Sequence, residues 1–200
     1  MRIIVVGGTG TIGEAVVELL KKEHEVIVVG ASNGDIQVDI SSVDSIRKMY
    51  ETLGPFDHLI STVGKAQFGK LTEMTGESYK LGLDNKLMGQ VNLVLEGLKS
   101  INDNGSFTLT TGILNREPIL GATSAAMVNS AIEGFVKAAA LEMPKNIRLN
   151  VVSPTVITEA LNVYGNYFKG YESVDAKIVA NAYLKSISSH HNGAIYKVGF

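Results

Sequence analysis

Three glycines near the start of the chain have the spacing of a loop that binds a pyrophosphate. Gly7, Gly10 and Gly13 form a G-x-x-G-x-x-G pattern directly after the apolar run Ile3–Val6. At such a loop a phosphate approaches backbone N–H groups at the positive end of a helix, and a Cβ would hold it off. The pattern is a variant of the dinucleotide fingerprint, and it also fits a tight turn with no ligand. A P-loop is excluded, because Glu14–Ala15 stands where a Lys and a Ser or Thr are required.

The residues around this loop predict the elements that position it. Ile3–Val6 predicts a buried strand, and the apolar residues at 15, 16, 19 and 20 share one face of a predicted helix. Further strands are predicted at 25–29, 36–38, 57–62 and 194–198, and helices at 41–53, 78–98 and 122–141, the first of them capped by Ser41 and Asp44. Repeated strand–helix units favour a doubly wound parallel sheet with helices on both faces. A ligand then binds at the carboxyl ends of the strands.

Composition limits the class of protein. Two hundred residues, 45% of them hydrophobic, fit one domain over residues 1–200. A net charge of −2 with mixed charges argues against nucleic acid as a partner. The chain has no cysteine and no His/Asp/Glu cluster with the spacing of metal ligands. The apolar run at the N-terminus is too short for a signal peptide, and no apolar stretch approaches the ~18 residues of a membrane span. We therefore expect a cytoplasmic protein without a membrane partner.

The end of the second predicted strand bears on the choice of cofactor. In a dinucleotide-binding fold, an acidic residue at this point favours NAD by bonding the ribose 2′-hydroxyl. Here the strand ends in Gly30-Ala31-Ser32, and the Ser32 hydroxyl is able to donate to a 2′-phosphate that no adjacent carboxylate repels. Asp35 is interpreted as a turn residue, and no arginine lies nearby. The segment favours NADP slightly over NAD.

Several segments together resemble the short-chain dehydrogenases and reductases. Besides the glycine loop, Val38-Asp39-Ile40 resembles the family's adenine-contacting segment, and Ser61-Thr62-Val63-Gly64 stands where the family usually has Asn-Asn-Ala-Gly. Similarity at 83–89, 105–112, 131–135 and 147–154 extends the resemblance over nearly the whole chain. It implies a single-domain Rossmann fold of about seven parallel strands that binds NAD(P). Together with Ser32, the implied cofactor-binding positions are Gly7, Thr9, Gly10, Thr11, Ile12, Gly13, Asp39, Ile40, Ser61, Thr62, Val63, Gly64 and Pro154.

The same resemblance shows that most of the family's catalytic residues are missing. Family members typically use a tyrosine as general acid or base, a lysine four residues later that lowers the tyrosine pKa, a serine that orients the substrate oxygen, and an asparagine that supports a proton relay. Ala125, Asn129 and Gly112 occupy the tyrosine, lysine and serine positions, and the segment 80–163 contains no tyrosine. Of the family's active-site residues only Asn85 is retained.

Three nearby features are candidate replacements. Lys86 follows Asn85 and would point about 100° away from it on an α-helix, which favours a solvated or interface charge. Thr111 has a hydroxyl beside the lost serine, although threonine is also a common strand former. The segment 162–171 contains three tyrosines, which would cover an apolar ligand or equally cap the sheet. For His58 we expect a local hydrogen bond, and for the pair His190–His191 no chemical role.

Two functions from different classes follow. The first is an NAD(P)-dependent oxidoreductase acting on a small carbonyl or alcohol with an altered acid–base group, because hydride transfer is the cofactor's own chemistry. The second is a catalytically silent NAD(P)-binding sensor or oligomeric scaffold, because the usual Ser, Tyr and Lys are absent. Isomerisation or dehydration in the same pocket is a further alternative. The apolar segments 78–98 and 122–141, which often form the family's dimer interface, predict a homodimer or homotetramer.

Overall fold

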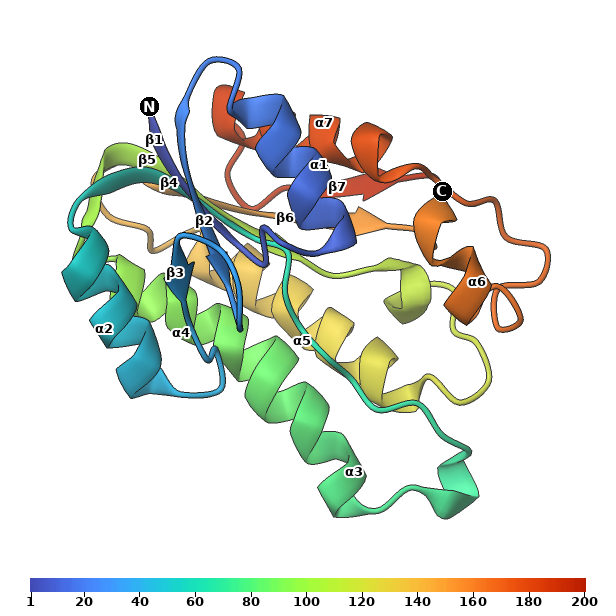
Figure 1. Ribbon diagram of the computed structural model, residues 1–200. Coiled ribbons are helices and arrows are strands. Elements are labelled where there is room, and N and C mark those ends of the chain that lie inside the picture. Colours follow the sequence, from blue (N-terminus) through green and yellow to red (C-terminus); the bar gives the residue numbers. More distant parts are fainter.

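A seven-stranded parallel sheet forms the centre of the molecule. The computed structural model describes residues 1–200, and Figure 1 shows the sheet between two layers of helices. The order across the sheet is β3-β2-β1-β4-β5-β6-β7, and each neighbouring pair is parallel. The predicted single-domain, doubly wound fold is therefore confirmed. The strands are β1 (Arg2–Val6), β2 (Glu25–Gly30), β3 (Ile36–Gln37), β4 (Phe56–Ser61), β5 (Ile101–Thr110), β6 (Arg148–Pro154) and β7 (Ile195–Val198).

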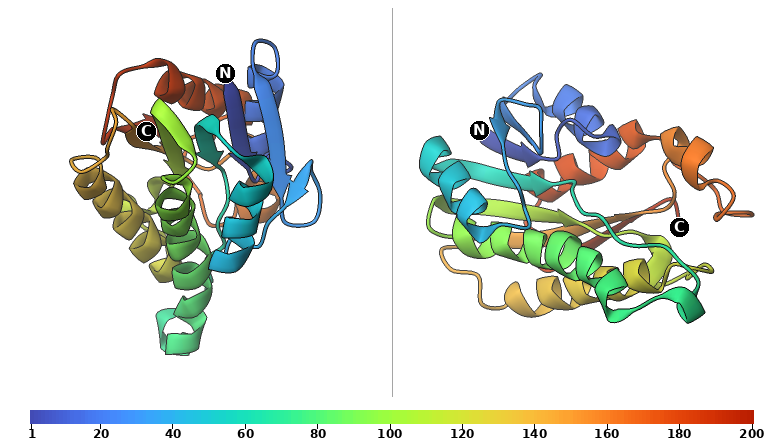
Figure 2. Two further views of the ribbon diagram at one scale, coloured as in Figure 1. Left: turned by 90° about the vertical axis from the view of Figure 1, so that its left-hand side faces the viewer. Right: turned by 60° about the horizontal axis from the view of Figure 1, so that its bottom comes forward.

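The longer helices divide between the two faces of the sheet. Figure 2 shows α1 (Thr11–Leu20) and α7 (Ala176–Ser188) on one face, and α2 (Val43–Leu53), α4 (Met88–Gly97) and α5 (Thr123–Ala139) on the other. Two shorter helices, α3 (Gly76–Lys80) and α6 (Leu161–Tyr164), lie in the connections after β4 and β6. Single 3₁₀ turns occur at Leu71–Glu73, Ile113–Asn115 and Thr158–Ala160.

The two sides of β1 supply the two halves of the core. Successive side chains of a strand point to opposite faces. Ile4 and Val6 pack into the cluster formed with α2, α4 and α5, whereas Ile3 and Val5 pack into the cluster formed with α1 and α7. All four side chains are completely buried. This burial on both faces explains why the strand is a continuous apolar run and does not alternate with polar residues.

The helix expected over 78–98 is interrupted by a π-helical turn. Leu81–Leu87 forms this turn, with α3 before it and α4 after it. A π-helical turn bonds residue i to i+5, so its side chains take directions that an α-helix does not give. The expectation of one continuous α-helix is wrong at this point. The turn contains Asn85 and Lys86, two of the three predicted catalytic candidates.

The N-terminus of α2 shows a smaller departure from prediction. Its N-cap is Ser42, whose side-chain oxygen accepts a hydrogen bond from the backbone N–H of Ser45 at 3.2 Å. A side-chain acceptor of this kind satisfies one of the free N–H groups of the first turn. The predicted cap formed by Ser41 and Asp44 is therefore displaced by one residue.

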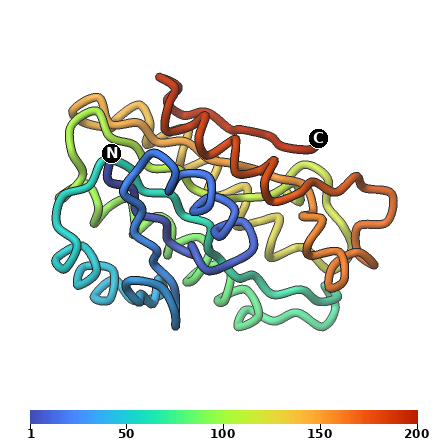
Figure 3. Tube along the Cα trace, turned by 45° about the horizontal axis from the view of Figure 1, so that its top comes forward, coloured from blue at the N-terminus to red at the C-terminus, as the bar shows by residue number.

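Because all strands are parallel, their carboxyl ends meet at one edge of the sheet. Figure 3 shows the two termini at opposite ends of the molecule, with the segment that connects β6 to α7, in orange, at the same end as the C-terminus. That end holds the loops that follow β1, β2, β4, β5 and β6. None of the helices has both the length and the apolar character needed to cross a membrane.

Candidate functional site

The first cavity at this edge is built from the loops that follow β1, β2, β3 and β4. It has a volume of about 550 Å³ and lies where the strand order reverses between β1 and β4. Ligands of doubly wound folds bind at this switch point. Its lining residues are Val6, Gly7, Thr9, Gly10, Gly30, Ala31, Val38, Asp39, Ile40, Thr62, Val63, Gly64, Lys65 and Asn85.

The glycine loop has the geometry that a pyrophosphate requires. Gly7 has φ +83°, a conformation that L side chains rarely adopt, and its N–H donates to the Val29 carbonyl at 2.7 Å. A Cβ on Gly13 would overlap the Gly7 carbonyl oxygen, so α1 packs directly against the turn. A Cβ on Gly10 meets only the Gly7 carbonyl oxygen, at 3.4 Å. The free N–H groups of the first turn of α1 follow Gly10, and the cradle therefore fits a dinucleotide phosphate.

The loop after β2 presents no carboxylate at its start. Asp35 Oδ2 accepts a hydrogen bond from the Val28 N–H at 2.8 Å, so this carboxylate is turned back onto β2, as expected of a turn residue. Ser32 is exposed just outside the cavity lining. Asp39 does line the cavity, and its Oδ1 accepts from the Ser41 N–H at 2.9 Å.

A second cavity of about 560 Å³ adjoins the first. Gly64 and Lys65 line both, so the two cavities meet at the loop after β4. The second cavity also holds Ile12 and Pro154, two of the predicted cofactor residues. Its other lining residues are Ala66, Phe68, Leu81, Lys86, Thr111, Gly112, Ile113, Leu114, Ala125, Asn129, Thr155, Val156, Ile157, Ala160, Tyr164 and Phe168.

Four predicted cofactor residues line neither cavity. Thr11 and Gly13 belong to the first turn of α1, and Ser32 lies outside the lining. Ser61 is completely buried beneath the site, where its hydroxyl donates to Gln90 Oε1 at 3.0 Å. The remaining predicted cofactor residues lie on one or both cavities.

The π-helical turn presents Asn85 and Lys86 to different cavities. Asn85 lines the first, where its Oδ1 accepts from the Lys65 N–H at 2.9 Å and its Nδ2 donates to Ser41 Oγ at 3.1 Å. Lys86 lines the second cavity only. The half-buried stem of Lys86 packs against Gly64 and the residue lines the second cavity, which argues against a freely solvated charge. A role of Lys86 at an interface between subunits stays a prediction. Burial lowers the pKa of this amine to about 8.

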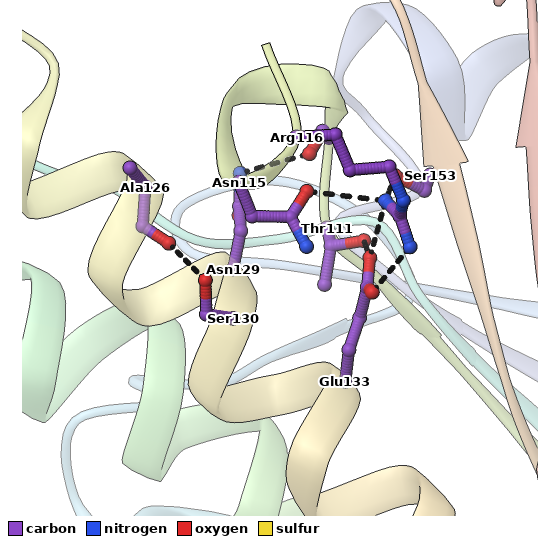
Figure 4. Close-up of polar contacts among 9 residues, drawn as sticks. Thr111, Asn115, Arg116, Ala126, Asn129, Ser130, Glu133 and Ser153 are labelled. Carbon is purple, nitrogen blue, oxygen red and sulfur yellow. Dashed lines mark hydrogen bonds and ion pairs between the residues drawn. The ribbon is translucent and has the colours of Figure 1, made fainter. Parts of the chain in front are cut away.

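Thr111 is connected to a buried ion pair behind the second cavity. Its hydroxyl donates to Glu133 Oε1 at 3.2 Å. The same carboxylate receives both guanidinium nitrogens of Arg116, with Nη1 at 2.9 Å from Oε1. Figure 4 shows Arg116 held between Glu133, Ser153 and Asn115. Little in the sequence indicates this ion pair, because 17 residues separate Arg116 from Glu133 and Glu133 lies on a helix of mostly small residues.

The three residues that replace the family's catalytic groups all line the second cavity. Ala125, Asn129 and Gly112 lie together there, as the resemblance implies. Asn129 Nδ2 donates to the Gly112 carbonyl at 3.2 Å (Figure 4), whereas its buried Oδ1 has no hydrogen-bond partner. A buried carbonyl oxygen without a donor is costly to the stability of the folded chain.

Aromatic side chains cover the outer part of the second cavity. The Phe68 ring lies 6.1 Å from both the Tyr164 and the Tyr167 rings, centroid to centroid. Tyr164 and Phe168 line the cavity, whereas the Tyr171 hydroxyl donates to the Glu117 carbonyl at 3.4 Å. The segment 162–171 was predicted either to cover an apolar ligand or to cap the sheet. These contacts favour the first interpretation, because two of its aromatic residues lie on the second cavity.

The histidines lie away from both cavities. His58 is buried in β4, where its Nδ1 is 2.8 Å from Ser106 Oγ, and the expected local hydrogen bond is confirmed. Burial lowers its pKa to about 4. His191 Nδ1 is 3.0 Å from the Tyr196 hydroxyl, and His190 is exposed.

Comparison with known proteins identifies the family. The family model described as enoyl-(acyl carrier protein) reductase matches residues 5–194. The structure of the protein lin1944 from Listeria innocua is 47% identical, covers 98% of each chain and superposes with a TM-score of 0.97. A small-chain dehydrogenase in complex with NADPH is 30% identical over 99% of this chain and 96% of that chain, with a TM-score of 0.89.

Curated relatives are more distant and longer. Versicolorin reductase 1 of Dothistroma septosporum is 28% identical over 151 residues, which are 72% of this chain and 57% of the relative. The chain thus spans little more than half the length of that protein. The family match, the strand order and the glycine loop agree with one another. The chain belongs to the short-chain dehydrogenase/reductase family of oxidoreductases.

Proposed function

We propose that the protein binds NADP(H) in the first cavity and acts as an oxidoreductase on a small carbonyl or alcohol held in the second. The observation that carries the proposal is the meeting of the two cavities at Gly64 and Lys65. The glycine loop would hold the dinucleotide in the first cavity, and this cofactor would supply the hydride donor or acceptor for a substrate in the adjoining one. Ile12 and Pro154, which line the second cavity, would pack against the nicotinamide.

The residues of the chain divide into binding and acid–base roles. Asn85 holds the loop that carries Lys65, which makes it a positioning residue. Lys86 and Thr111 are the candidates for contact with the substrate oxygen, because both line the second cavity. An amine with a pKa of about 8 is largely protonated at pH 7 and is suited to donate a proton. The Thr111 hydroxyl hydrogen is already donated to Glu133, which leaves its oxygen as an acceptor.

NADP is proposed over NAD on two grounds. The Asp35 carboxylate is turned back onto β2, and Ser32 is exposed two residues after Gly30, which lines the first cavity. The related small-chain dehydrogenase was solved with NADPH.

The absence of cysteine supports a reducing compartment such as the cytoplasm.

A silent binding protein is the second candidate function. It is favoured by Ala125, Asn129 and Gly112 at the positions of the family's Tyr, Lys and Ser. In this case the protein binds the dinucleotide without turnover, as a sensor or an oligomeric scaffold. A homodimer or homotetramer through α4 and α5 is compatible with either function.

Two measurements test the proposal. Fluorescence titration with NADPH and NADH reports cofactor binding, with NADPH expected to bind more tightly. NADPH oxidation is then followed over a panel of small aldehydes and ketones. Oxidation that depends on a carbonyl supports the oxidoreductase, binding without oxidation across the panel supports the silent protein, and binding of neither cofactor contradicts both.

A further inference from the structure

The second cavity holds positive charge and no negative charge. Its titratable lining residues are Lys65, Lys86 and Tyr164, and no aspartate or glutamate is among them. Lys65 also lines the first cavity and is exposed, whereas Lys86 lines the second cavity alone. The positive charges in the lining are therefore those of Lys65 and Lys86, and Lys86 is the one that belongs to this cavity alone.

Lys86 has no acidic partner within the chain. It takes part in none of the ion pairs of the structure. Glu133 lies behind Thr111 on the same side of the cavity, but Arg116 neutralises it. Asp84, two residues before Lys86, is exposed and lines neither cavity. A partly buried ammonium without a counter-ion is costly, and a ligand anion would remove that cost.

The other polar groups of the cavity are mostly engaged. The Thr111 hydroxyl donates to Glu133, and Asn129 Nδ2 donates to the Gly112 carbonyl. The Lys86 ammonium is left as a donor for a ligand, because Asn129 Oδ1, although unpaired, is fully buried. The rest of the wall is largely apolar and aromatic, with Phe68, Tyr164 and Phe168 on the outer side.

We propose that the second cavity takes a carbonyl or alcohol substrate that carries an apolar ring and a carboxylate, with the carboxylate paired to the Lys86 ammonium. The ring packs against Phe68 and Phe168, which line the same cavity. This assignment rests on the proposed function, in which the second cavity is the substrate site, and it requires the carboxylate to stand next to the reacting oxygen so that the Lys86 ammonium contacts both. It narrows the substrate class from any small carbonyl to oxo or hydroxy acids with an apolar body.

The test compares two probes of matched shape, 2-naphthoate and 2-naphthamide, which differ in charge. Their binding to the NADPH-saturated protein and to the cofactor-free protein is measured by calorimetry at pH 7. Naphthoate is expected to bind about tenfold more tightly than the amide, the usual size of one charge-assisted contact. Lys86→Met removes this preference, and Lys86→Arg retains most of it. Lys80→Met, which removes an exposed lysine paired with Glu77, leaves the preference unchanged.

A pH series of the unmodified protein gives a second readout that needs no variant. Naphthoate stays charged above pH 6, so its advantage over the amide falls only as Lys86 loses its proton. The advantage is therefore expected to hold at pH 7 and to decline above about pH 8.

The outcomes separate this assignment from the proposed function. Equal binding of the two probes, or a preference that survives Lys86→Met, overturns the assignment. A Lys86→Met variant that keeps the naphthoate preference and loses NADPH affinity places Lys86 with the cofactor and also overturns it. If NADPH does not bind, the proposed function is contradicted. The pairing of a carboxylate with Lys86 is still tested in that case, by naphthoate binding to the cofactor-free protein.

Discussion

The stem of Lys86 lies directly across Gly64, the residue at which the two cavities meet. A Cβ on Gly64 would lie 2.9 Å from Lys86 Cβ and would overlap its Cγ. Gly64 also has φ +133°, which favours glycine. The loop after β4 and the π-helical turn therefore fit together only because residue 64 has no side chain.

Gly64→Ala is expected to lower the free energy of unfolding by about 2 kcal/mol, from backbone strain together with the overlap on Lys86. Gly54→Ala is the matched control, because Gly54 has φ +67° but no atom within 4 Å of an added Cβ. Urea denaturation of both variants separates the cost of backbone strain, which both share, from the cost of the overlap with Lys86, which only Gly64→Ala has. Lys86→Ala in the Gly64→Ala background should restore part of the loss, and no restoration would show that the two side chains do not interfere.

Substitutions at Gly13 and Gly10 are expected to affect different properties. The first should lower stability, and the second should lower cofactor affinity. Gly13→Ala drives a methyl group into the Gly7 carbonyl and should reduce stability by at least about 2 kcal/mol. At Gly10 an added Cβ meets only the Gly7 carbonyl oxygen, at 3.4 Å, and the backbone is extended with φ −95°, so Gly10→Val should cost less than about 1 kcal/mol, mainly from the poorer N-cap. Its side chain enters the first cavity, and NADPH affinity should fall at least about tenfold. Unchanged affinity in a folded Gly10→Val protein would place the dinucleotide elsewhere.

Removing Arg116 should be strongly destabilising. The side chain of Glu133 is 6% exposed, and Arg116→Ala leaves its carboxylate buried without a counter-charge. A loss of about 3 kcal/mol in the free energy of unfolding at pH 7 is expected. Lys80→Ala, which breaks an exposed pair with Glu77, should cost less than about 1 kcal/mol. Similar losses for the two variants in urea denaturation would contradict a structural role for the buried pair.

His58 should make the protein less stable in mild acid. Burial lowers its pKa from 6.5 to about 4, so between these values the unfolded chain binds a proton that the folded chain does not. The free energy of unfolding should fall by up to about 3 kcal/mol as the pH drops from 6.5 to 4. His58→Gln should flatten this part of the profile, although it also loses the contact with Ser106. His190→Gln, at an exposed position, is the control, and an identical slope in both variants would exclude His58 as the cause.

The outer face of α4 and α5 should mediate self-association. Met88 and Leu95 on α4 are 41% and 49% exposed, and Met127 on α5 is 40% exposed. Size-exclusion chromatography with light scattering should give at least twice the 21.4 kDa of one chain. Leu95→Glu should shift the mass to the monomer, whereas Leu141→Glu, outside this face, should not. A monomeric unmodified protein would refute the expectation.

The sequence predicted the fold and the glycine loop well, because these depend on local patterns. Runs of β-branched residues predict buried strands, and the spacing of Gly7, Gly10 and Gly13 predicts a tight turn between a strand and a helix. The direction of Lys86 could not be predicted, because a π-helical turn is set by packing and not by a residue pattern. The pair of Arg116 and Glu133 was missed for a similar reason, since it forms only when the loop after β5 folds over α5.

The π-helical turn contributes residues to both cavities. Asn85 contacts the loop of the first cavity and Lys86 enters the second, and a single peptide bond joins the two residues. A rotation of this turn therefore moves both groups together. The shapes of both cavities therefore depend on one short segment of backbone, Leu81–Leu87.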